Sequence, residues 1–349
     1  MTSRHTAPSL VAYARALLAG AGLDPEKAEA VASVLVEGDL LGHTTHGLQL
    51  LAPYLKELET GGMTRTGEPA VIADFPSAVT WDGRRLPGAW LVVRALELAA
   101  GRARRQGVCT VVIRRCHHIA CLAAYLRPVA EQGLMALLTC SDPTMGGVAP
   151  HGGRRSVYTP DPLAAAWPTD GDPVILDVSM SIATNGLAKR LHAEGRRFPG
   201  PWAVDGDGRP TDDPAALFGD KAGALLPMGG LDHGHKGYAL ALMVEALTSG
   251  LAGRGRADPA EGWTANVFVQ VLDPALFGSR EDFIRQTSWL ADACRDTPTR
   301  PGFDRVRLPG EAGLRRRAEQ LSSGVELYPG ILDSLEPWAK KFGIAPMAG

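Results

Sequence analysis

Residues 108–139 read VCTVVIRRCHHIACLAAYLRPVAEQGLMALLT, and this stretch decides the fold class. Val108–Ile113 and Leu134–Thr139 are short apolar runs, which are typical of strands buried on both faces. Between them, Ala120–Gln132 has the spacing of a helix, and Gly133 follows as an end signal. A strand, a helix and a second strand in succession predict an α/β fold.

The same alternation continues on both sides of this stretch. Further helices are expected at 8–21, from 24 to about 39, and at 48–60, 89–106, 236–251, 279–295, 312–321 and 331–342. Further strands are expected within 70–81 and at 174–178, 266–272 and 305–308. The segment 140–173 is rich in Gly, Pro and Asp, and such long loops are usually functional.

Composition excludes several classes of protein. The 349 residues carry 36 Lys and Arg against 38 Asp and Glu, which argues against a nucleic-acid or anionic-membrane partner. No apolar run approaches the ~20 residues of a membrane span, and Met1–Pro8 lacks the apolar core of a signal peptide. The five cysteines include no Cys-x-x-Cys pair, which favours a reducing, cytoplasmic location.

Familiar catalytic motifs are absent. The sequence has no Gly-x-Gly-x-x-Gly after a strand, no Walker loop, no Gly-x-Ser-x-Gly and no His-Glu-x-x-His. Glycine is nevertheless abundant, with 41 residues, and clusters such as Gly152-Gly153 and Gly229-Gly230 would permit close approach to a ligand. No metal is expected, because the alternative, a zinc site from His117, His118, His233, His235 and Cys140, lacks the usual ligand spacing.

Histidines gather in three polar breaks between the expected elements: 43 and 46, 117 and 118, and 233 and 235. His118 follows the strand at 108–113, at the edge where α/β sheets bind ligands. Backbone N–H groups before the helix at 236, together with Lys236, are suited to phosphate. The competing interpretation for a single loop histidine, a structural or merely exposed role, is the more common one. These residues predict a site but do not identify its reaction.

Seven motifs between Ala14 and Leu332 then carry a resemblance to one family. They are Asp39-x-x-Gly42-x-x-Thr45-His46-Gly47 with Tyr54; Arg115-Cys116-His117-His118 with Ala123 and Tyr125; Cys140-Ser141-Asp142-Pro143; Leu176-Asp177-Val178-Ser179-Met180-Ser181; Trp202-Ala203-Val204-Asp205 with Pro210-Thr211; His235-Lys236-Gly237-Tyr238; and Pro309-Gly310-Glu311. In them the chain resembles the malate/L-lactate dehydrogenase-like family of NAD(P)-dependent oxidoreductases. That family includes ureidoglycolate and sulfolactate dehydrogenases and cyclic imino acid reductases.

The resemblance implies a non-Rossmann α/β fold with two interleaved domains. Residues 1–115 with 265–349 would form a helical part for substrate binding and dimerisation, and 116–264 a cofactor-binding α/β part. The implied protein is a homodimer that uses NAD(H) or NADP(H). It would transfer hydride between the nicotinamide and a 2-keto or 2-hydroxy acid. Reduction of a cyclic imine is the alternative activity, and a non-catalytic nucleotide-binding relative is the alternative class.

The resemblance also implies roles for individual residues. His118 would be the general acid/base, a role that suits histidine because its pKa lies near neutral. Asp142 would orient the imidazole and favour its protonated form, and His46 would contact the substrate. Thr45, Leu50, Tyr54 and Arg115 would also lie around the substrate. The cofactor would be lined by Ser141, Pro160, Asp161, Asp177, Val178, Ser179, Ser181, His235, Lys236, Gly237, Pro309, Gly310 and Glu311.

Three departures from the family pattern fall near this site. Leu50 stands where the family has an Arg suited to a bidentate grip on a substrate carboxylate. Thr159-Pro160-Asp161-Pro162 replaces Gly-Thr-Asn-Pro, and Ala120 replaces a Gly. The departures predict a larger or less charged substrate, or a replacement cation, for which Arg115 is the candidate.

Overall fold

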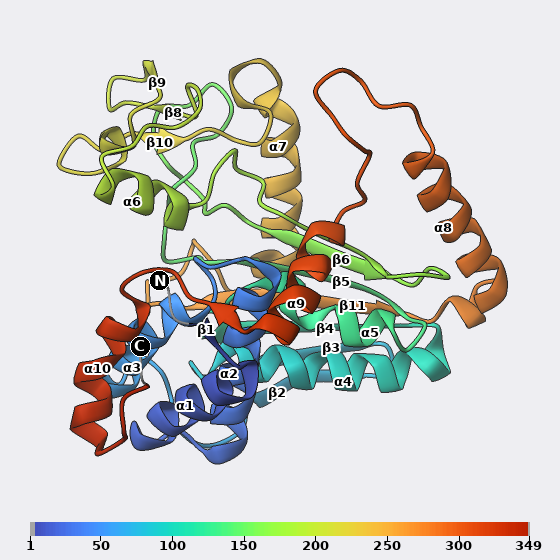
Figure 1. The fold of residues 1–349 in the computed structure, drawn as a ribbon, viewed down its shortest axis with the longest axis horizontal. Helices are drawn as coiled ribbons and strands as arrows, with labels where there is room; N and C mark the ends of the chain where they lie inside the picture. Colours follow the sequence, from blue (N-terminus) through green and yellow to red (C-terminus); the bar gives the residue numbers. More distant parts are fainter. Residues whose placement is uncertain (1–3, 348–349) are drawn as a thin grey trace.

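The structure, a computed structural model, describes residues 4–347 and is built around a seven-stranded sheet (Figure 1). The strands lie in the order β2-β3-β4-β11-β5-β6-β7. Their bounds are β2 Ala70–Phe75, β3 Ala78–Asp82, β4 Val108–Cys116, β5 Met135–Ser141, β6 Leu163–Trp167, β7 Val174–Val178 and β11 Ala265–Leu272. The α/β class predicted from residues 108–139 is confirmed.

The sheet is mixed rather than parallel. β3 pairs with β4 in parallel, whereas β11 lies antiparallel between β4 and β5. The two strands of the opening stretch therefore run in the same direction without being neighbours. A strand from far along the chain separates them, which a reading of local sequence does not reveal.

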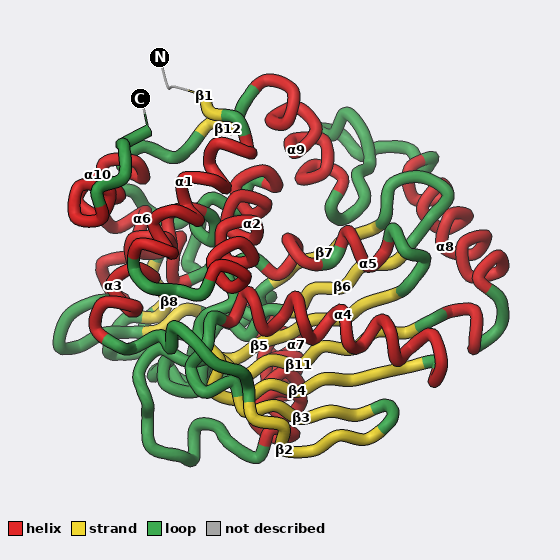
Figure 2. Tube along the Cα trace, turned by 90° about the horizontal axis from the view of Figure 1, so that it is seen from below, coloured by secondary structure: helices red, strands yellow, loops and turns green. Residues whose placement is uncertain are grey.

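Helices cover both faces of the sheet (Figure 2). On one face α4, Gly88–Gln106, packs on β4 and β11; on the other, α7, Gly230–Glu245, and the π turn η4, Ala246–Gly250, pack on β5 and β11. The remaining long helices are α1 Ala7–Gly20, α2 Pro25–Leu41, α3 Leu51–Thr60, α8 Arg280–Arg295, α9 Glu311–Ser323 and α10 Ile331–Phe342. Among residues 4–347, no helix combines the length and apolar character needed to span a bilayer.

A smaller lobe has its own core, formed by residues between 148 and 244 such as Val148, Tyr158, Phe198 and Leu225. It carries α6, Asn185–Ala193, and a three-stranded sheet of β8 Ala203–Val204, β9 Pro210–Thr211 and β10 Ala224–Leu225. Strands β5, β6 and β7 belong to the large sheet instead. The predicted division into 1–115 with 265–349 and 116–264 therefore does not follow the sheet, and its boundary cuts the end of β4.

The helix predicted at Ala120–Gln132 is wrong as a continuous element. Only the 3-10 turn η2, Leu122–Tyr125, and the single α turn α5, Arg127–Ala130, are helical. Ala120 has φ +59°, a left-handed conformation that no helix contains. Pro128 has no N–H and is tolerated only in a first helical turn, so the ladder breaks before it. The apolar spacing reflects burial of this connection beneath the sheet edge rather than a regular helix.

Other expectations are corrected or refined. Residues 305–308 form no strand and instead wall a cavity, while β6 lies in the expected loop 140–173. Helix α7 begins at Gly230, six residues before the predicted start. Its buried Gly237 allows close packing, since a Cβ there would lie 2.4 Å from the Met228 carbonyl oxygen. The predictions for α1, α3, α4, α8 and α10 are confirmed to within three residues at each end.

Candidate active site

His118 stands just beyond β4, where the backbone turns sharply. Arg115 has φ +52°, and its carbonyl oxygen accepts a hydrogen bond of 2.7 Å from the N–H of Arg85. Gly88 begins α4 beside this turn, and a Cβ there would lie 2.0 Å from the His117 carbonyl oxygen. The loop between β3 and α4 therefore determines where His117 and His118 point, and it requires glycine at position 88.

The buried Tyr54 on α3 holds the His118 imidazole. Its hydroxyl oxygen lies 2.7 Å from Nδ1 of His118 and 3.4 Å from the carbonyl oxygen of the same residue. The Ala120 N–H points at the same Nδ1, at 3.3 Å. Because a hydroxyl both donates and accepts, Tyr54 can hold either neutral tautomer of the ring, and also the charged ring.

Two further rings pack around His118. The His46 ring centroid lies 6.0 Å away, and that of Trp263 lies 4.9 Å from both His118 and His117. Burial lowers the pKa of His118 well below its ordinary value, and the neighbouring His46 and His117 lower it further. Burial also lowers the pKa of His46, although the Asp177 carboxylate opposes that shift. This environment therefore favours the neutral form of His118.

Asp39 fixes the loop that carries His46. Its Oδ2 accepts a 2.7 Å hydrogen bond from the N–H of Leu48, the first residue of the 3-10 turn η1, Leu48–Leu50. Its side chain is buried and Gly47 lies against the carboxylate, where a Cβ would be 2.2 Å from Oδ1. Burial raises the pKa of Asp39 to about 7. Within the same loop, the Thr45 hydroxyl lies 2.9 Å from Nδ1 of His46.

Arg190 on α6 attaches the smaller lobe to the same loop. Its guanidinium donates to the Thr44 hydroxyl at 3.1 Å and to the Gln49 side-chain oxygen at 2.6 Å. The guanidinium also lies 3.8 Å from the centre of the Tyr328 ring. The His46 loop is thus held between the lobes by a cation that the sequence did not indicate.

A cavity of about 860 Å³ opens beside the His46 loop. Its walls are the loop 298–309, the start of α9, the end of α2, and part of β7. Gly310 is required in this wall because its φ is +86° and a Cβ would lie 2.7 Å from the Ile175 carbonyl oxygen. Of the predicted cofactor residues, Asp177, Pro309 and Gly310 line the cavity.

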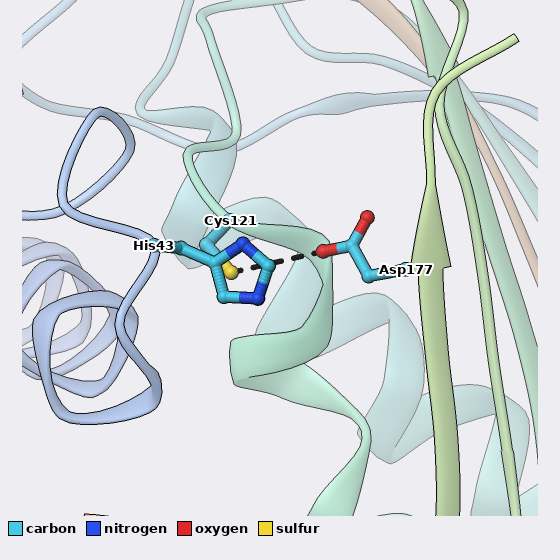
Figure 3. A group of neighbouring side chains, drawn as sticks. All are labelled: His43, Cys121 and Asp177. Atoms are coloured by element: carbon cyan, nitrogen blue, oxygen red, sulfur yellow. Dashed lines mark hydrogen bonds between the residues drawn. The ribbon is translucent and has the colours of Figure 1, made fainter. Parts of the chain in front are cut away.

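Three side chains of this wall, His43, Cys121 and Asp177, point toward one another (Figure 3). Within residues 4–347 they form the one group of three potential metal ligands whose donor atoms all lie within 4.8 Å. Burial and the Asp177 charge raise the pKa of the Cys121 thiol well above its usual range. The thiol therefore keeps its proton, and metals bind the thiolate. Asp177 instead accepts the Ala123 N–H at 2.9 Å, which ties β7 to η2.

The zinc alternative considered from the sequence does not assemble. His233 and His235 lie exposed in the first two turns of α7, with ring centroids 6.3 Å apart. His117 and His118 pack instead on Trp263.

Ten predicted cofactor residues do not line the cavity: Ser141, Pro160, Asp161, Val178, Ser179, Ser181, His235, Lys236, Gly237 and Glu311. Ser141, for example, is buried with its hydroxyl 2.8 Å from that of Thr248. Asp142 does not hold the imidazole in this structure, because its carboxylate accepts hydrogen bonds from the N–H and hydroxyl of Thr144. The residue that contacts the imidazole at Nδ1 is Tyr54, at 2.7 Å.

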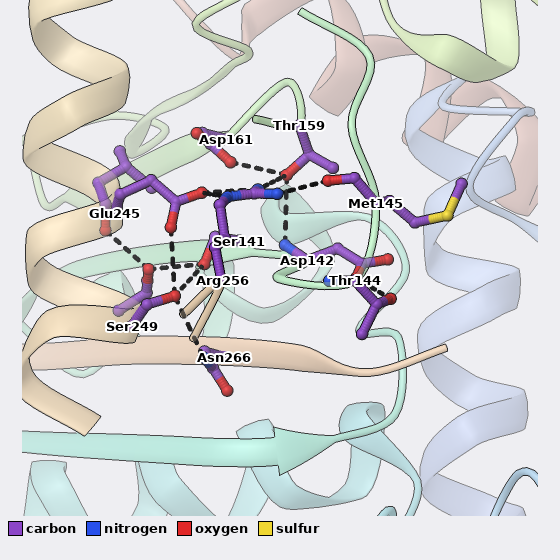
Figure 4. Close-up of polar contacts among 12 residues, drawn as sticks. Ser141, Asp142, Thr144, Met145, Thr159, Asp161, Glu245, Ser249, Arg256 and Asn266 are labelled. Atoms are coloured by element: carbon purple, nitrogen blue, oxygen red, sulfur yellow. Dashed lines mark hydrogen bonds and ion pairs between the residues drawn. The ribbon is translucent and has the colours of Figure 1, made fainter. Parts of the chain in front are cut away.

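Asp161, which replaces the family's Asn, lies in a buried polar cluster (Figure 4). Its φ is +44°, a conformation that Asn and Asp tolerate best among residues with a side chain. Oδ1 accepts the Thr159 hydroxyl at 2.7 Å, and Oδ2 has no hydrogen-bond partner. Burial, together with the charge of Glu245, raises its pKa to about 8. A protonated Asp161 has the shape and donor capacity of the amide it replaces.

Asp161→Asn is expected to change how stability depends on pH. Because the folded pKa of about 8 exceeds the unfolded value of about 3.9, folding binds a proton here between those values. The stability that this group contributes is full below pH ~3.9 and is lost as pH rises through about 8. From pH 5 to pH 9, the free energy of unfolding of the Asn variant should rise relative to that of wild type by at least ~1.4 kcal/mol, the equivalent of one pKa unit.

Urea unfolding at pH 5 and pH 9 measures this difference. Asp292→Asn is the matched control, since Asp292 is exposed on α8 and is paired only with Arg295 one turn away. Parallel pH profiles for wild type and Asp161→Asn would show that Asp161 is ionised throughout.

Comparison with known proteins shows the family of this chain. Residues 6–336 match the malate/L-lactate dehydrogenase family. The chain belongs to that family. It shares 33% identity with an L-lactate dehydrogenase of Cupriavidus necator over 339 residues, which is 95% of this chain and 96% of that one.

Two further relatives differ in the reaction that their names state. A Delta(1)-pyrroline-2-carboxylate/Delta(1)-piperideine-2-carboxylate reductase of Pseudomonas syringae pv. tomato is 31% identical over 348 residues, covering 95% of each chain. The solved malate dehydrogenase of Pyrococcus horikoshii OT3 superposes with a TM-score of 0.89 at 27% identity, covering 99% of this chain and 97% of that one. Membership of the family confirms the predicted non-Rossmann fold and the prediction of an NAD(P)-dependent oxidoreductase.

Proposed function

We propose that this protein reduces a C=O or C=N group next to a carbonyl carbon, reversibly, with His118 as the general acid/base. The observation that carries the proposal is the buried Tyr54 hydroxyl on Nδ1 of His118, with His46 alongside. The cavity fits a dinucleotide, because its volume is about 860 Å³ and it adjoins His43 of the His46 loop. At Gly310 the backbone approaches so closely that a Cβ would lie 2.7 Å from the Ile175 carbonyl oxygen. When bound, the nicotinamide supplies or accepts the hydride.

The protein's own part is to move one proton and to orient the substrate. During reduction, protonated His118 gives its Nε2 proton to the substrate oxygen or nitrogen, while Nδ1–H donates to the Tyr54 oxygen. Burial makes this imidazolium a stronger acid than free histidine, which favours the transfer. In the opposite direction the neutral ring takes the proton back. The Trp263 ring packs against the imidazole, with the ring centroids 4.9 Å apart.

We propose further that the substrate is larger or less charged than a simple 2-keto acid. Leu50 packs against the hydrophobic core instead of offering a cation. The predicted substitute, Arg115, is engaged elsewhere, because its guanidinium lies 2.8 Å from Asp82 and 3.2 Å from Glu261. Position 50 therefore has no cation to bind a small carboxylate, and the cation at position 115 is already paired with two carboxylates.

Leu50→Arg is expected to raise kcat/KM for simple 2-keto acids at least ~10-fold, since a hydrogen bond to a charged group contributes about 1.5–3 kcal/mol. The measurement is oxidation of NADPH and NADH with a panel of 2-keto acids and cyclic imino acids. A wild-type protein that already turns over pyruvate-like acids as well as the variant would contradict the substrate proposal. Cofactor binding without turnover across the panel would favour a non-catalytic relative instead.

We propose a homodimer in a reducing compartment, the cytoplasm. Large apolar side chains are exposed along α7 and α8, including Leu240, Met243, Trp289 and Leu290. Exposed apolar patches of this kind mark interaction surfaces. His235 and Lys236 are exposed on the same helix α7. In a dimer formed through this helix, the two residues would lie next to the active site of the second copy. All five cysteines are free thiols. Light scattering in solution tests the dimer by its mass.

A further inference from the structure

Arginine dominates the charge of the cavity beside the His46 loop. Four arginines line it: Arg300, Arg305 and Arg307 in the loop 298–309, and Arg316 on α9. Asp177 is the one acidic residue among the described residues that line it. Such a charge distribution predicts an anion at the arginine side, because guanidinium groups match phosphate oxygens in shape and charge.

The arginine loop lies away from the proton-transfer residues. Figure 1 places the loop between α8 and α9 on the α8 side of α9, whereas α2, from which the His46 loop departs, lies on the other side. Asp177 belongs to the catalytic end of the cavity, since its carboxylate lies within 4.8 Å of a ring nitrogen of His43 in the His46 loop. A dinucleotide with its nicotinamide near His46 and His118 would thus have its adenosine half near the loop.

Two of the four arginines, Arg300 and Arg307, are unpaired in the loop, whereas the guanidinium of Arg316 lies against Gly42 at the end of α2. Nη1 of Arg305 lies 3.0 Å from Oε1 of Glu311, so its charge is balanced. Arg300 lies over the Phe303 ring at 4.4 Å, and within residues 4–347 no ion pair engages Arg300, Arg307 or Arg316. Arg300 and Arg307 are exposed to solvent at the cavity wall.

Among the described residues, no carboxylate lines the arginine side of the cavity; Asp304 lies in the same loop but is not part of the lining. Enzymes that select NAD(H) commonly use an Asp or Glu on the 2′-hydroxyl, whereas an Arg accommodates the 2′-phosphate of NADP(H). Glu311 is occupied, because it also accepts the Leu308 N–H at 3.0 Å and does not line the cavity. Asp177 accepts the Ala123 N–H and lies at the other end.

We propose that Arg300 and Arg307 bind the 2′-phosphate of the cofactor and that the protein selects NADP(H) over NAD(H). This inference rests on the proposed function. A phosphate monoester carries a charge of about −1.5 to −2 at neutral pH, which two guanidinium groups neutralise. The ribose diol of NAD(H) is uncharged, so its binding would not compensate for the loss of water from these guanidinium groups.

The first test is fluorescence titration of the protein with NADPH and NADH in the absence of substrate. Wild type should bind NADPH at least ~10-fold more tightly, a difference of 1.4 kcal/mol. The double variant Arg300→Gln/Arg307→Gln should weaken NADPH binding at least ~10-fold and NADH binding by less than ~3-fold. Arg315→Gln is the matched control, since Arg315 lies on α9 beside Arg316 but does not line the cavity.

The second test needs no nicotinamide. Calorimetry compares adenosine 2′,5′-bisphosphate with 5′-AMP, which differ only by the 2′-phosphate. Wild type should prefer the bisphosphate, and the double variant should lose that preference. Equal affinity of wild type for NADPH and NADH would overturn the inference. Equal weakening of both dinucleotides in the double variant would overturn it as well, by assigning the arginines to the pyrophosphate. Failure of both dinucleotides to bind wild type would instead overturn the proposed function.

Discussion

His118→Gln is expected to lower kcat by about 10²–10⁴-fold, the usual contribution of a positioned general acid/base. Glutamine can still donate a hydrogen bond, but it cannot hold and release a proton near neutral pH. Affinity for the reduced cofactor should change by less than ~3-fold, which is under 1 kcal/mol. Steady-state kinetics and fluorescence titration measure the two effects. A variant that keeps wild-type kcat would show that another group transfers the proton.

Tyr54→Phe separates positioning from proton transfer. Without the hydroxyl, Nδ1–H of charged His118 loses its acceptor, so the pKa of the ring should fall further. In the reduction direction the alkaline limb of the kcat profile should move to lower pH, with a fall in kcat of about 10-fold, equivalent to one charge-assisted hydrogen bond. A purely structural role would lower activity without moving the profile. Tyr13→Phe, on the distant α1, is the control.

Gly47→Ala is expected to destabilise the fold by about 1–3 kcal/mol, the usual range for overpacking a filled interior. The added methyl carbon would lie 2.2 Å from Oδ1 and 2.3 Å from Cγ of Asp39, well inside van der Waals contact. Asp39 cannot retreat without losing its hydrogen bond to the Leu48 N–H. The loop should therefore shift and take His46 with it, so activity should fall along with stability.

Urea unfolding and kinetics on the same preparation test this expectation. Gly101→Ala is the matched control, because nothing lies within 4 Å of the added carbon inside α4. That change should be neutral or stabilise the protein by up to ~1 kcal/mol, through the higher helix propensity of alanine. Equal stability and activity of the two variants would show that the His46 loop tolerates a methyl group at Gly47.

Elements with strong local signals were predictable from the sequence. Helix α3 ends at Gly61, whose φ of +78° is the left-handed cap that glycine supplies, and α10 has its predicted bounds, 331–342. The failures at 120–132 and 305–308 have different causes. Residues 120–132 are apolar because other parts of the chain cover them, and burial of that kind imposes no regular period. Residues 305–308 alternate Arg with Val and Leu, which resembles a strand pattern, but the arginines are exposed in a loop that walls the cavity.

The departures from the family pattern became interpretable only with backbone angles. Ala120 and Asp161 stand where the family has Gly and Asn, and both have positive φ. Glycine and asparagine are the residues that adopt this conformation most readily. The two positions are therefore constrained by the backbone, and Asp161 meets the constraint as a buried acid whose pKa is raised.

The sequence by itself determined the local elements, the family, and the presence of His46, His118 and Leu50. Only the tertiary structure decided which groups these residues meet: the Tyr54 hydroxyl on His118, 64 residues away, and Asp82 on Arg115, 33 residues away. It also decided that unpaired arginines face one cavity. The physical reason is that hydrophobic periodicity and capping report interactions along a few neighbouring residues. Partner choice depends on how distant segments pack, where a displacement of an ångström makes or breaks a hydrogen bond.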